Sequence, residues 1–314
     1  MSTRSALLLL PLLFVAGGCP RFHAGPIPDP PAGATFVEVD GVRVRYLDQG
    51  QGPAVVLLHG YGASLDTWRT IAPQLSQRFR ILAVDLKGFG FTSRPPGDYS
   101  PAAQARLVWN VLERRGVRDV AVVAHSWGAS VALAMALQEP NRVRRLALYS
   151  AFVYEAQVPS FFLWARSALL GEVLFGLFYR ERLEERFALA FYDDRYVTVE
   201  RLEVAERELR RPGTVAAALA AARGQRYSRV ERSYQTIDKP ALLLWGRDDI
   251  VTPLDFGERL AADLPDARLV VLPRCGHYPM LEARAASTRE LAAFLGEDLR
   301  SQAGLEPISP REVE

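Results

Sequence analysis

The chain has 314 residues, of which 49% are hydrophobic and 24% charged, and its 38 Lys and Arg nearly balance its 36 Asp and Glu to a formal net charge of +2. This length and apolar content suit one large globular domain, or a domain with an insertion, and exclude a disordered chain. The basic residues, almost all arginine, are interleaved with acidic ones. Because nucleic-acid-binding surfaces are clustered and basic, we expect no nucleic-acid partner.

The first twenty residues have the pattern of a secretory signal. Arg4 precedes an apolar run over residues 6–18, and small residues stand directly before Cys19. The run is shorter than the roughly 20 residues that span a bilayer, so we predict a signal peptide over residues 1–18 and not a permanent transmembrane helix. The proline-rich stretch "GPIPDPPAGA" then predicts a stiff spacer over residues 19–34.

From residue 35 onward, short apolar runs alternate with longer amphipathic stretches. "TFVEVDG" and "VRVRYLDQG" predict an antiparallel pair with its turn at Asp40 and Gly41. Four nearly continuous apolar runs follow, namely "AVVLLHG", "RILAVDL", "VAVVAHS" and "RLALYS". Since strands that are buried on both faces show such runs, we predict an α/β core with a mostly parallel sheet and helices on both faces.

The pattern of buried strands is interrupted after Ser150 and resumes only with "KPALLLWG" at residues 239–246. The intervening segments, such as "ERLEERFALAFY", have helical patterns. We therefore predict an α-helical cap, inserted after the sixth of eight strands. The predicted boundaries are residues 35–152 and 237–298 for the core, 153–236 for the cap and 299–314 for a tail.

Three side chains with catalytic chemistry follow three of the predicted strands. "AHSWG" places Ser126 between a buried strand and a small-residue helix, where a strained turn needs small neighbours. "WGRDDIVTP" supplies Asp248 and Asp249 after a later strand, and "RCGHYPMLE" supplies His277 after the last one. Serine, acid and base in this order are typical of a hydrolytic triad.

These motifs resemble those of the α/β-hydrolase fold with a helical cap, over residues 36–297. "DLKGFGFTSRP" and "GHYPMLE" are similar to further segments of that family, although Lys87 stands where arginine is common. The resemblance implies an eight-stranded sheet, Ser126 as nucleophile and His277 as base. The family pattern G-x-x-D, counted from Gly246, implies Asp249 as the acid.

In this mechanism His277 takes the proton of Ser126, and an acyl-enzyme forms and is hydrolysed without a metal or an organic cofactor. The backbone N–H groups of Tyr61 and Trp127 are expected to bind the oxyanion. We predict a substrate pocket lined by the apolar residues Trp127, Phe152 and Phe161, together with His59, which is also expected to brace the oxyanion loop. Cys275 is expected to be a buried, inert thiol.

We expect the substrate to be a small ester with an apolar acyl or aromatic part. Carbon–carbon bond hydrolases resemble the chain around "WGRDD" and "CGH", but commonly carry Asn where this chain has His125. Aminopeptidase or perhydrolase activity on the same triad is a further alternative, with Glu155, Asp193 or Asp194 available to bind an amine. A non-catalytic ligand-binding module on the same fold, or a scaffold that binds partners at a membrane surface, is the non-enzymatic alternative.

The segment "VAGGC" resembles the lipobox of bacterial lipoproteins, in which the cysteine becomes a lipid-bearing N-terminus. The resemblance implies lipidation of Cys19, export from a bacterial cytoplasm and anchoring in the cell envelope. Pro20 is not the aspartate associated with inner-membrane retention, so we expect the outer membrane. Without lipidation, the protein would be secreted or periplasmic.

Overall fold

The computed structural model describes residues 20–302 of the chain. The predicted signal peptide, Cys19 and residues 303–314 of the predicted tail lie outside the described residues. The last helix, α11 (Arg284–Gln302), continues past residue 298, where the core was expected to end.

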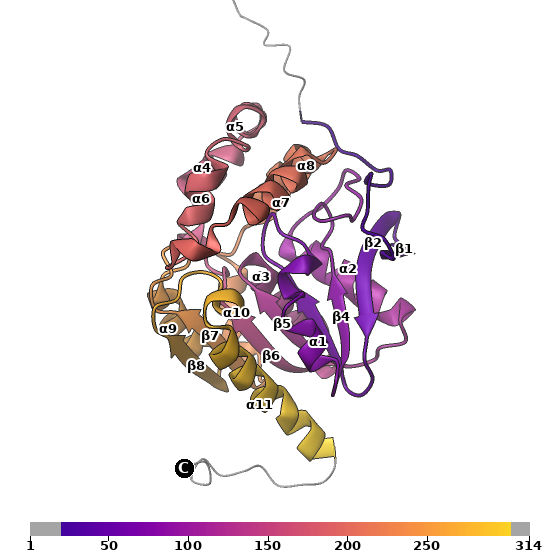
Figure 1. Cartoon of the computed structure of the whole chain (residues 1–314), viewed down its shortest axis with the longest axis vertical. Coiled ribbons are helices and arrows are strands. Elements are labelled where there is room, and N and C mark those ends of the chain that lie inside the picture. The colour runs from indigo at the N-terminus through magenta and orange to yellow at the C-terminus, as the bar shows by residue number, and fades with distance from the viewer. Residues whose placement is uncertain (1–19, 303–314) are drawn as a thin grey trace, which may run out of the picture.

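An eight-stranded sheet runs through the centre of the molecule, in the order β1-β2-β4-β3-β5-β6-β7-β8 (Figure 1). The first two pairings, β1 with β2 and β2 with β4, are antiparallel, and all the others are parallel. This confirms the predicted mostly parallel sheet. The strands are β1 (Thr35–Val39), β2 (Val42–Gln49), β3 (Ala54–Leu58), β4 (Arg80–Val84), β5 (Val120–His125), β6 (Val143–Tyr149), β7 (Ala241–Gly246) and β8 (Ala267–Leu272).

The turn between β1 and β2 lies at the predicted position. Asp40 and Gly41 both have positive φ, at 51° and 74°, and Val39 pairs with Val42. Two successive residues with positive φ give the turn geometry that matches the twist of two-residue hairpins.

Helices cover both faces of the sheet, as the apolar strands require. One buried cluster joins the sheet to α2 (Pro101–Arg114), α3 (Trp127–Gln138) and α9 (Leu254–Asp263). A second cluster on the other face joins it to α1 (Ala72–Leu75) and α11. These two clusters lie between Val39 and Leu295, so a chain that begins at Pro20 contains the complete core of the sheet.

Five helices between β6 and β7 form a separate layer at one end of the sheet (Figure 1). They are α4 (Ser160–Ala165), α5 (Leu170–Phe178), α6 (Leu183–Ala188), α7 (Val199–Arg210) and α8 (Thr214–Gly224). This layer, with its connections, is the cap. Within the described residues, no helix is long and apolar enough to cross a membrane.

Candidate active site

The sharp turn from β5 to α3 fixes the backbone of Ser126. All six residues of β5 are buried, and Ser126 has φ 52° and ψ −123°, a combination that is costly for a non-glycine residue. Its N–H donates to the Tyr149 carbonyl at 2.9 Å, and its carbonyl accepts from Ala129 at 2.9 Å and from Phe152 at 3.1 Å. Three backbone bonds thus hold Ser126 in a conformation that the isolated chain would avoid.

Glycine at two neighbouring positions permits this close packing. A Cβ at Gly128 would lie 2.5 Å from the carbonyl oxygen of His59, and a Cβ at Gly60 would lie 3.1 Å from the Cβ of Ser126. The first distance is shorter than any real contact, so the start of α3 approaches the loop after β3 only because residue 128 has no side chain. The same packing brings the loop of Gly60 and Tyr61 against the candidate nucleophile.

Asp249 and His277 meet at the ends of β7 and β8. The Asp249 Oδ2 atom lies 2.9 Å from His277 Nδ1, and both side chains are buried. Burial opposes ionisation of Asp249, but attraction to His277 and hydrogen bonds from His277 and Thr252 outweigh it, so the pKa of Asp249 lies below its ordinary value. The adjacent Asp248 is exposed, and its backbone N–H donates to the Cys275 carbonyl.

Thr252 is a positioning residue that the sequence did not single out. Its N–H donates to Asp249 Oδ1 at 2.8 Å and its hydroxyl to Oδ2 at 2.7 Å. These bonds leave the carboxylate one orientation, toward His277. The segment "DDIVTP" carries this information, since a hydroxyl three residues after an aspartate can close such a turn.

Tyr61 and Trp127, the predicted oxyanion donors, flank the nucleophile. Trp127 is the first residue of α3, so its N–H has no partner within the helix. Over residues 20–302, no hydrogen bond uses the backbone N–H of Tyr61. The Tyr61 hydroxyl donates to the Ala218 carbonyl of the cap at 2.7 Å, and its ring packs edge-on against Trp127. Both residues are therefore held in place while an N–H remains available.

His59 has the bracing position expected of it, and its burial corrects the further expectation that it lines the substrate pocket. His59 is fully buried, its Nε2 accepts from the Leu86 N–H at 3.0 Å, and its Nδ1 lies 2.7 Å from the Gly60 carbonyl. With both nitrogens occupied, the ring connects the ends of β3 and β4 and braces the oxyanion loop. Burial lowers the pKa of His59, which keeps the ring neutral.

His125 also has a structural position. Its Nε2 lies 2.8 Å from the His277 carbonyl, and its ring centroid is 4.8 Å from that of His277. Burial, reinforced by repulsion from His277, lowers the pKa of His125 to about 3. The side chain is thus neutral, supports the backbone of His277 and does not act as a second base.

The predicted pocket phenylalanines have different surroundings. Phe152 is buried and packs against Tyr227, while Phe161 stacks on Phe175 inside the cap, at 5.1 Å between centroids. The side chain that joins cap and core is Phe162, which contacts the ring of Tyr61 at 5.1 Å and packs against the Phe152 cluster. Phe161 therefore belongs to the cap interior, and Phe162 occupies the position between cap and core that was expected of Phe161.

Glu282, the last residue of the short helix α10 (Pro279–Glu282) that follows His277, connects the triad to the cap. Its Oε1 accepts the N–H groups of Tyr192 and Asp193 at 2.8 and 3.1 Å, and its Oε2 accepts that of Gly276 at 2.7 Å. In addition, the His277 N–H donates to the Ala190 carbonyl at 2.8 Å. Residues 190–193 of the cap are thus bonded directly to the segment that carries the candidate base.

Two of the acidic side chains considered for an amine substrate, Glu155 and Asp193, are already engaged, and the third, Asp194, is exposed. Glu155 forms an ion pair with Arg166 at 2.6 Å and accepts the Tyr227 N–H at 2.8 Å. Asp193 pairs with Arg195 at 3.0 Å and begins a short helical turn that includes Asp194. These contacts hold the cap together and do not favour amine recognition. Within residues 20–302, no group of His, Cys, Asp and Glu is arranged to hold a metal ion.

Glu208 is a largely buried carboxyl group on α7 that the sequence pattern did not reveal. Its partners are Arg211 at 3.3 Å and the Ser64 hydroxyl. Burial raises its pKa to about 7, and repulsion from Asp85 and Asp66 acts in the same direction. Glu208 also interacts electrostatically with Tyr278, the residue after the candidate base.

We expect Glu208 to make stability depend on pH. The unfolded chain releases this proton near the ordinary pKa of 4.5 and the folded chain near 7, so the folded state binds the extra proton between these values. The free energy of unfolding should therefore fall as the pH rises from 4.5 to 7, by up to about 3 kcal/mol. Urea unfolding of Glu208→Gln should remove this fall and make the variant the more stable protein above neutral pH.

The matched control for this prediction is Glu203→Gln, an exposed residue of the same helix that pairs with Arg207 at 3.6 Å. It should retain the pH dependence of the unmodified protein. A Glu208→Gln variant that keeps the same pH dependence would contradict the prediction.

Comparison with known proteins agrees with this fold and site. A family model described as the alpha/beta hydrolase fold matches residues 53–283, and the chain belongs to this family. It is a hydrolase. The curated relatives include a 2-hydroxy-6-oxo-2,4-heptadienoate hydrolase of Pseudomonas putida, which is 30% identical over 287 residues that cover 83% of this chain and 95% of the relative.

Two solved structures illustrate the range of similar enzymes. The meta-cleavage product hydrolase CumD of Pseudomonas fluorescens has a TM-score of 0.73 at 26% identity, over 84% of this chain and 98% of the other. A membrane phospholipase A described as a bacterial virulence factor has a TM-score of 0.69 at 27% identity, over 87% of each chain. The chain is thus similar to enzymes that cleave carbon–carbon bonds and to one whose name denotes ester cleavage.

Proposed function

We propose that this hydrolase cleaves a carboxylic ester with an apolar acyl or aromatic part, through Ser126, Asp249 and His277. The observation that carries the proposal is the buried Asp249–His277 pair, bonded at 2.9 Å, at the same end of the sheet as a serine held at φ 52°. A serine on a strained turn, together with an oriented and carboxylate-paired histidine, is the arrangement used for acyl transfer.

In the proposed reaction His277 takes the proton from the Ser126 hydroxyl while the oxygen attacks the ester carbonyl carbon. The N–H groups of Tyr61 and Trp127 bind the oxyanion of the tetrahedral intermediate. Its collapse breaks the bond to the alcohol, which leaves with the proton from His277. Water then gives a proton to His277 and attacks the acyl-enzyme, and Ser126 is released with the carboxylic acid.

The surroundings of the nucleophile favour an uncharged, apolar substrate. The ring of Tyr61 contacts Phe89, Trp127, Phe162 and Tyr179, with centroids 5.1 to 6.4 Å apart. The similarity to the membrane phospholipase A also supports ester cleavage, because the name of that enzyme denotes an esterase and its sequence is 27% identical to this chain.

Carbon–carbon bond hydrolysis is the second candidate. It is favoured by the similarity to the 2-hydroxy-6-oxo-2,4-heptadienoate hydrolase, since the chain covers 95% of that enzyme at 30% identity. The substrate of that enzyme carries a carboxylate, whereas the aromatic surroundings of Tyr61 here do not require one.

One comparison of substrates separates the two candidates. Purified protein would be assayed with p-nitrophenyl esters of increasing acyl length and, separately, with 2-hydroxy-6-oxo-2,4-heptadienoate. We expect kcat/KM for the best ester to exceed that for the dienoate by at least about 100-fold, the discrimination that a binding difference of about 3 kcal/mol provides. The reverse order would replace ester cleavage by carbon–carbon bond cleavage as the function.

The proposal includes a location in the bacterial cell envelope, with a lipid on Cys19 as anchor. It is supported by the apolar run, the small residues before Cys19 and the proline-rich segment that follows. Radiolabelled palmitate should enter the full-length protein in a bacterial host and should not enter Cys19→Ser. Equal labelling of both proteins would overturn the lipoprotein assignment.

A further inference from the structure

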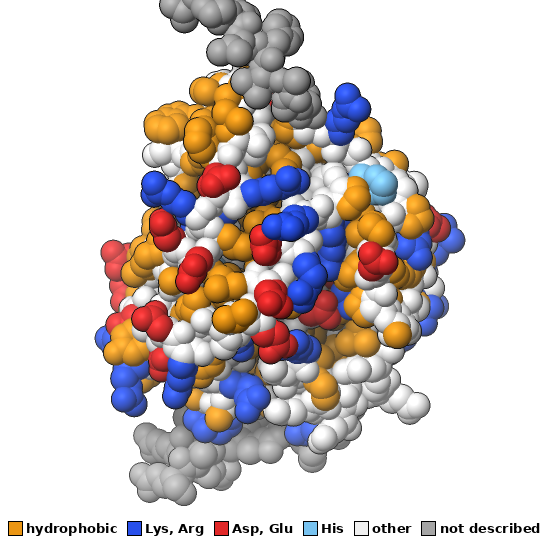
Figure 2. All heavy atoms as spheres, turned by 45° about the horizontal axis from the view of Figure 1, so that its top comes forward, with side chains coloured by type: hydrophobic (Ala, Val, Ile, Leu, Met, Phe, Trp, Pro, Cys, Tyr) orange, Lys and Arg blue, Asp and Glu red, His pale blue; other side chains and the backbone are white. Residues whose placement is uncertain are grey.

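Apolar side chains gather on the outer surface of the cap, where no part of the described chain covers them. Seven of them belong to α4, α5 and the residues next to α5, with exposed fractions between 40% and 79%. We call this set the cap patch: Leu163, Trp164, Leu169, Leu170, Val173, Leu177 and Phe178. Figure 2 shows hydrophobic side chains concentrated at this end of the molecule, at the top of the view.

The cap patch is not needed for the packing of the cap. One side of α5 faces the cap interior, where Phe175 and Tyr179, the residue directly after the helix, are buried. On another side of α5, Leu170, Val173 and Leu177 are exposed to solvent. They are three and four positions apart, so they form one continuous stripe along the helix. A helix that is apolar on both sides needs a second apolar environment.

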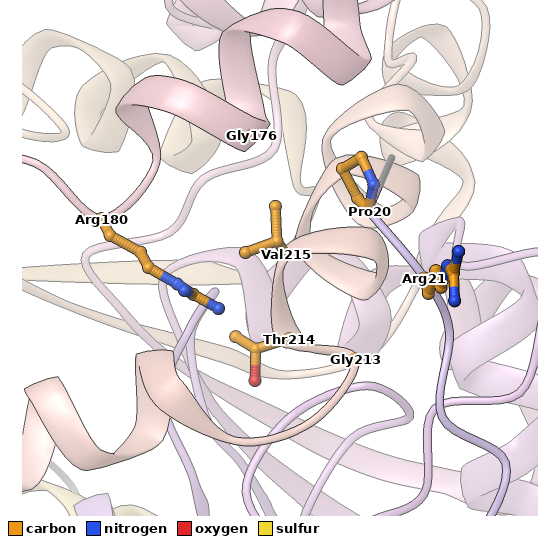
Figure 3. A pocket seen from close by; sticks show the side chains of 7 residues that line it. All are labelled: Pro20, Arg21, Gly176, Arg180, Gly213, Thr214 and Val215. Atoms are coloured by element: carbon orange, nitrogen blue, oxygen red, sulfur yellow. The ribbon is translucent and has the colours of Figure 1, made fainter. Parts of the chain in front are cut away.

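The chain enters the described structure beside this stripe. Pro20 lines a hollow together with Gly176 of α5 and Thr214 at the start of α8 (Figure 3). Cys19 directly precedes Pro20, so a lipid on this cysteine would be attached within one residue of the hollow. A lipid attached so close to the cap would hold the cap patch near the bilayer surface and raise the effective concentration for a second contact with it.

The charges at this end suit phospholipid head groups. Arg21 and Arg180 line the same hollow, and in Figure 3 the Arg180 side chain extends from the end of α5 toward Thr214. The acidic residue within α5, Glu172, is neutralised by Arg223 at 2.7 and 2.8 Å. Trp164, which is 59% exposed, is a side chain that favours the boundary between head groups and acyl chains.

From these observations we propose that the cap patch docks on an anionic phospholipid bilayer, with α5 lying in its interface and Arg21 and Arg180 facing the head groups. The inference rests on the proposed envelope location and does not depend on the catalytic assignment. Docking by the cap, in addition to a lipid on Cys19, gives the second membrane signal that stable anchoring requires.

The test uses the protein that begins at Pro20, which contains the complete core and carries no lipid. It would be mixed with vesicles of three parts phosphatidylethanolamine and one part phosphatidylglycerol and separated by flotation. The variant Leu170→Ser/Val173→Ser/Leu177→Ser should reduce the partition coefficient by at least about tenfold, because three exposed aliphatic side chains lose their contact with lipid. The control Val199→Ser/Val204→Ser alters exposed apolar residues of α7 and should partition like the unmodified protein.

Hydrolysis of a soluble short-chain ester, measured on the same samples, keeps this test independent of the proposed function. It should be equal in all three proteins, whatever the vesicles show. Flotation that is unaffected by the triple substitution, or no flotation of the unmodified protein, would overturn the docking. Two other occupants of the cap patch would overturn the docking as well. One is a second copy of the chain, which light scattering would show as a dimer that the triple variant loses. The other is the leader of the chain itself, which would be shown if residues 1–19 protected α5 from hydrogen exchange without vesicles.

Discussion

Ser126→Ala is expected to abolish covalent labelling by a fluorophosphonate and to lower kcat for ester hydrolysis by at least about 10³-fold. The fluorophosphonate reacts with an activated serine, and the strained turn and the Gly60–Tyr61 loop surround this hydroxyl alone in the proposed site. Labelling would be followed by in-gel fluorescence, and kcat with a p-nitrophenyl ester. The fold should persist, because the substitution removes one hydroxyl and leaves the backbone bonds of residue 126 in place.

Ser130→Ala is the matched control for Ser126→Ala. Ser130 lies one turn further along α3, is buried, and donates its hydroxyl hydrogen to the Trp127 carbonyl at 2.7 Å. The loss of this bond should reduce the free energy of unfolding by about 1 kcal/mol and leave labelling intact. If the folded unmodified protein is not labelled, Ser126 is not an activated nucleophile and the proposed acyl-enzyme mechanism is overturned.

Asp249→Asn should lower kcat by about 10⁴-fold, the effect that the corresponding change has in serine proteases. An amide at this position would accept one hydrogen bond from Thr252 but would turn an N–H toward His277 Nδ1, which favours the wrong tautomer of the base. The KM should change little, since the carboxylate orients the base and does not contact the substrate. Steady-state kinetics with the same ester provide both values.

Asp248→Asn is an unusually close control, because it makes the same chemical change one residue earlier. Asp248 is exposed, and its backbone N–H donates to the Cys275 carbonyl. Its kcat should stay within about twofold of the unmodified value, in keeping with the small effects of most surface substitutions. Equal losses in the two variants would show that charge near the loop, and not orientation of His277, determines the rate.

The sheet could be predicted because its strands are buried on both faces. Such strands appear in the sequence as continuous apolar runs, and the residues that follow β5, β7 and β8 then fall at one edge. The choice of Asp249 over Asp248 came from a family spacing, and the structure pairs Asp249 with His277. Thr252 was missed because a threonine near a turn has many ordinary roles.

The cap could be predicted only as a set of helices. Its α4 has six residues, too few for the periodicity to show whether Phe161 or Phe162 faces the core. Glu208 lies in "VERLEVAERELRR", whose alternating charges are typical of a solvated helix. In the structure its side chain, near the end of α7, is nevertheless largely buried beside Arg211. His59 could be placed beside the oxyanion loop because it directly precedes Gly60, but the amide of Leu86 that holds its ring could not be identified from the sequence. Contacts between elements that are distant in sequence decide all three cases.

The bonds from residues 190–193 to Glu282 and His277 have a mechanical consequence. An insertion joined to a domain only by its two chain connections can rotate as one body about the line between them. Besides the bond from Tyr61 to Ala218, Ala190, Tyr192 and Asp193 attach the cap to the segment that carries the base. Rotation of the cap away from this segment would break these last three hydrogen bonds and pull on the backbone of His277. Access to the nucleophile from this side and the position of the base are therefore coupled: a conformation wide open here is also one in which the proton acceptor is out of place.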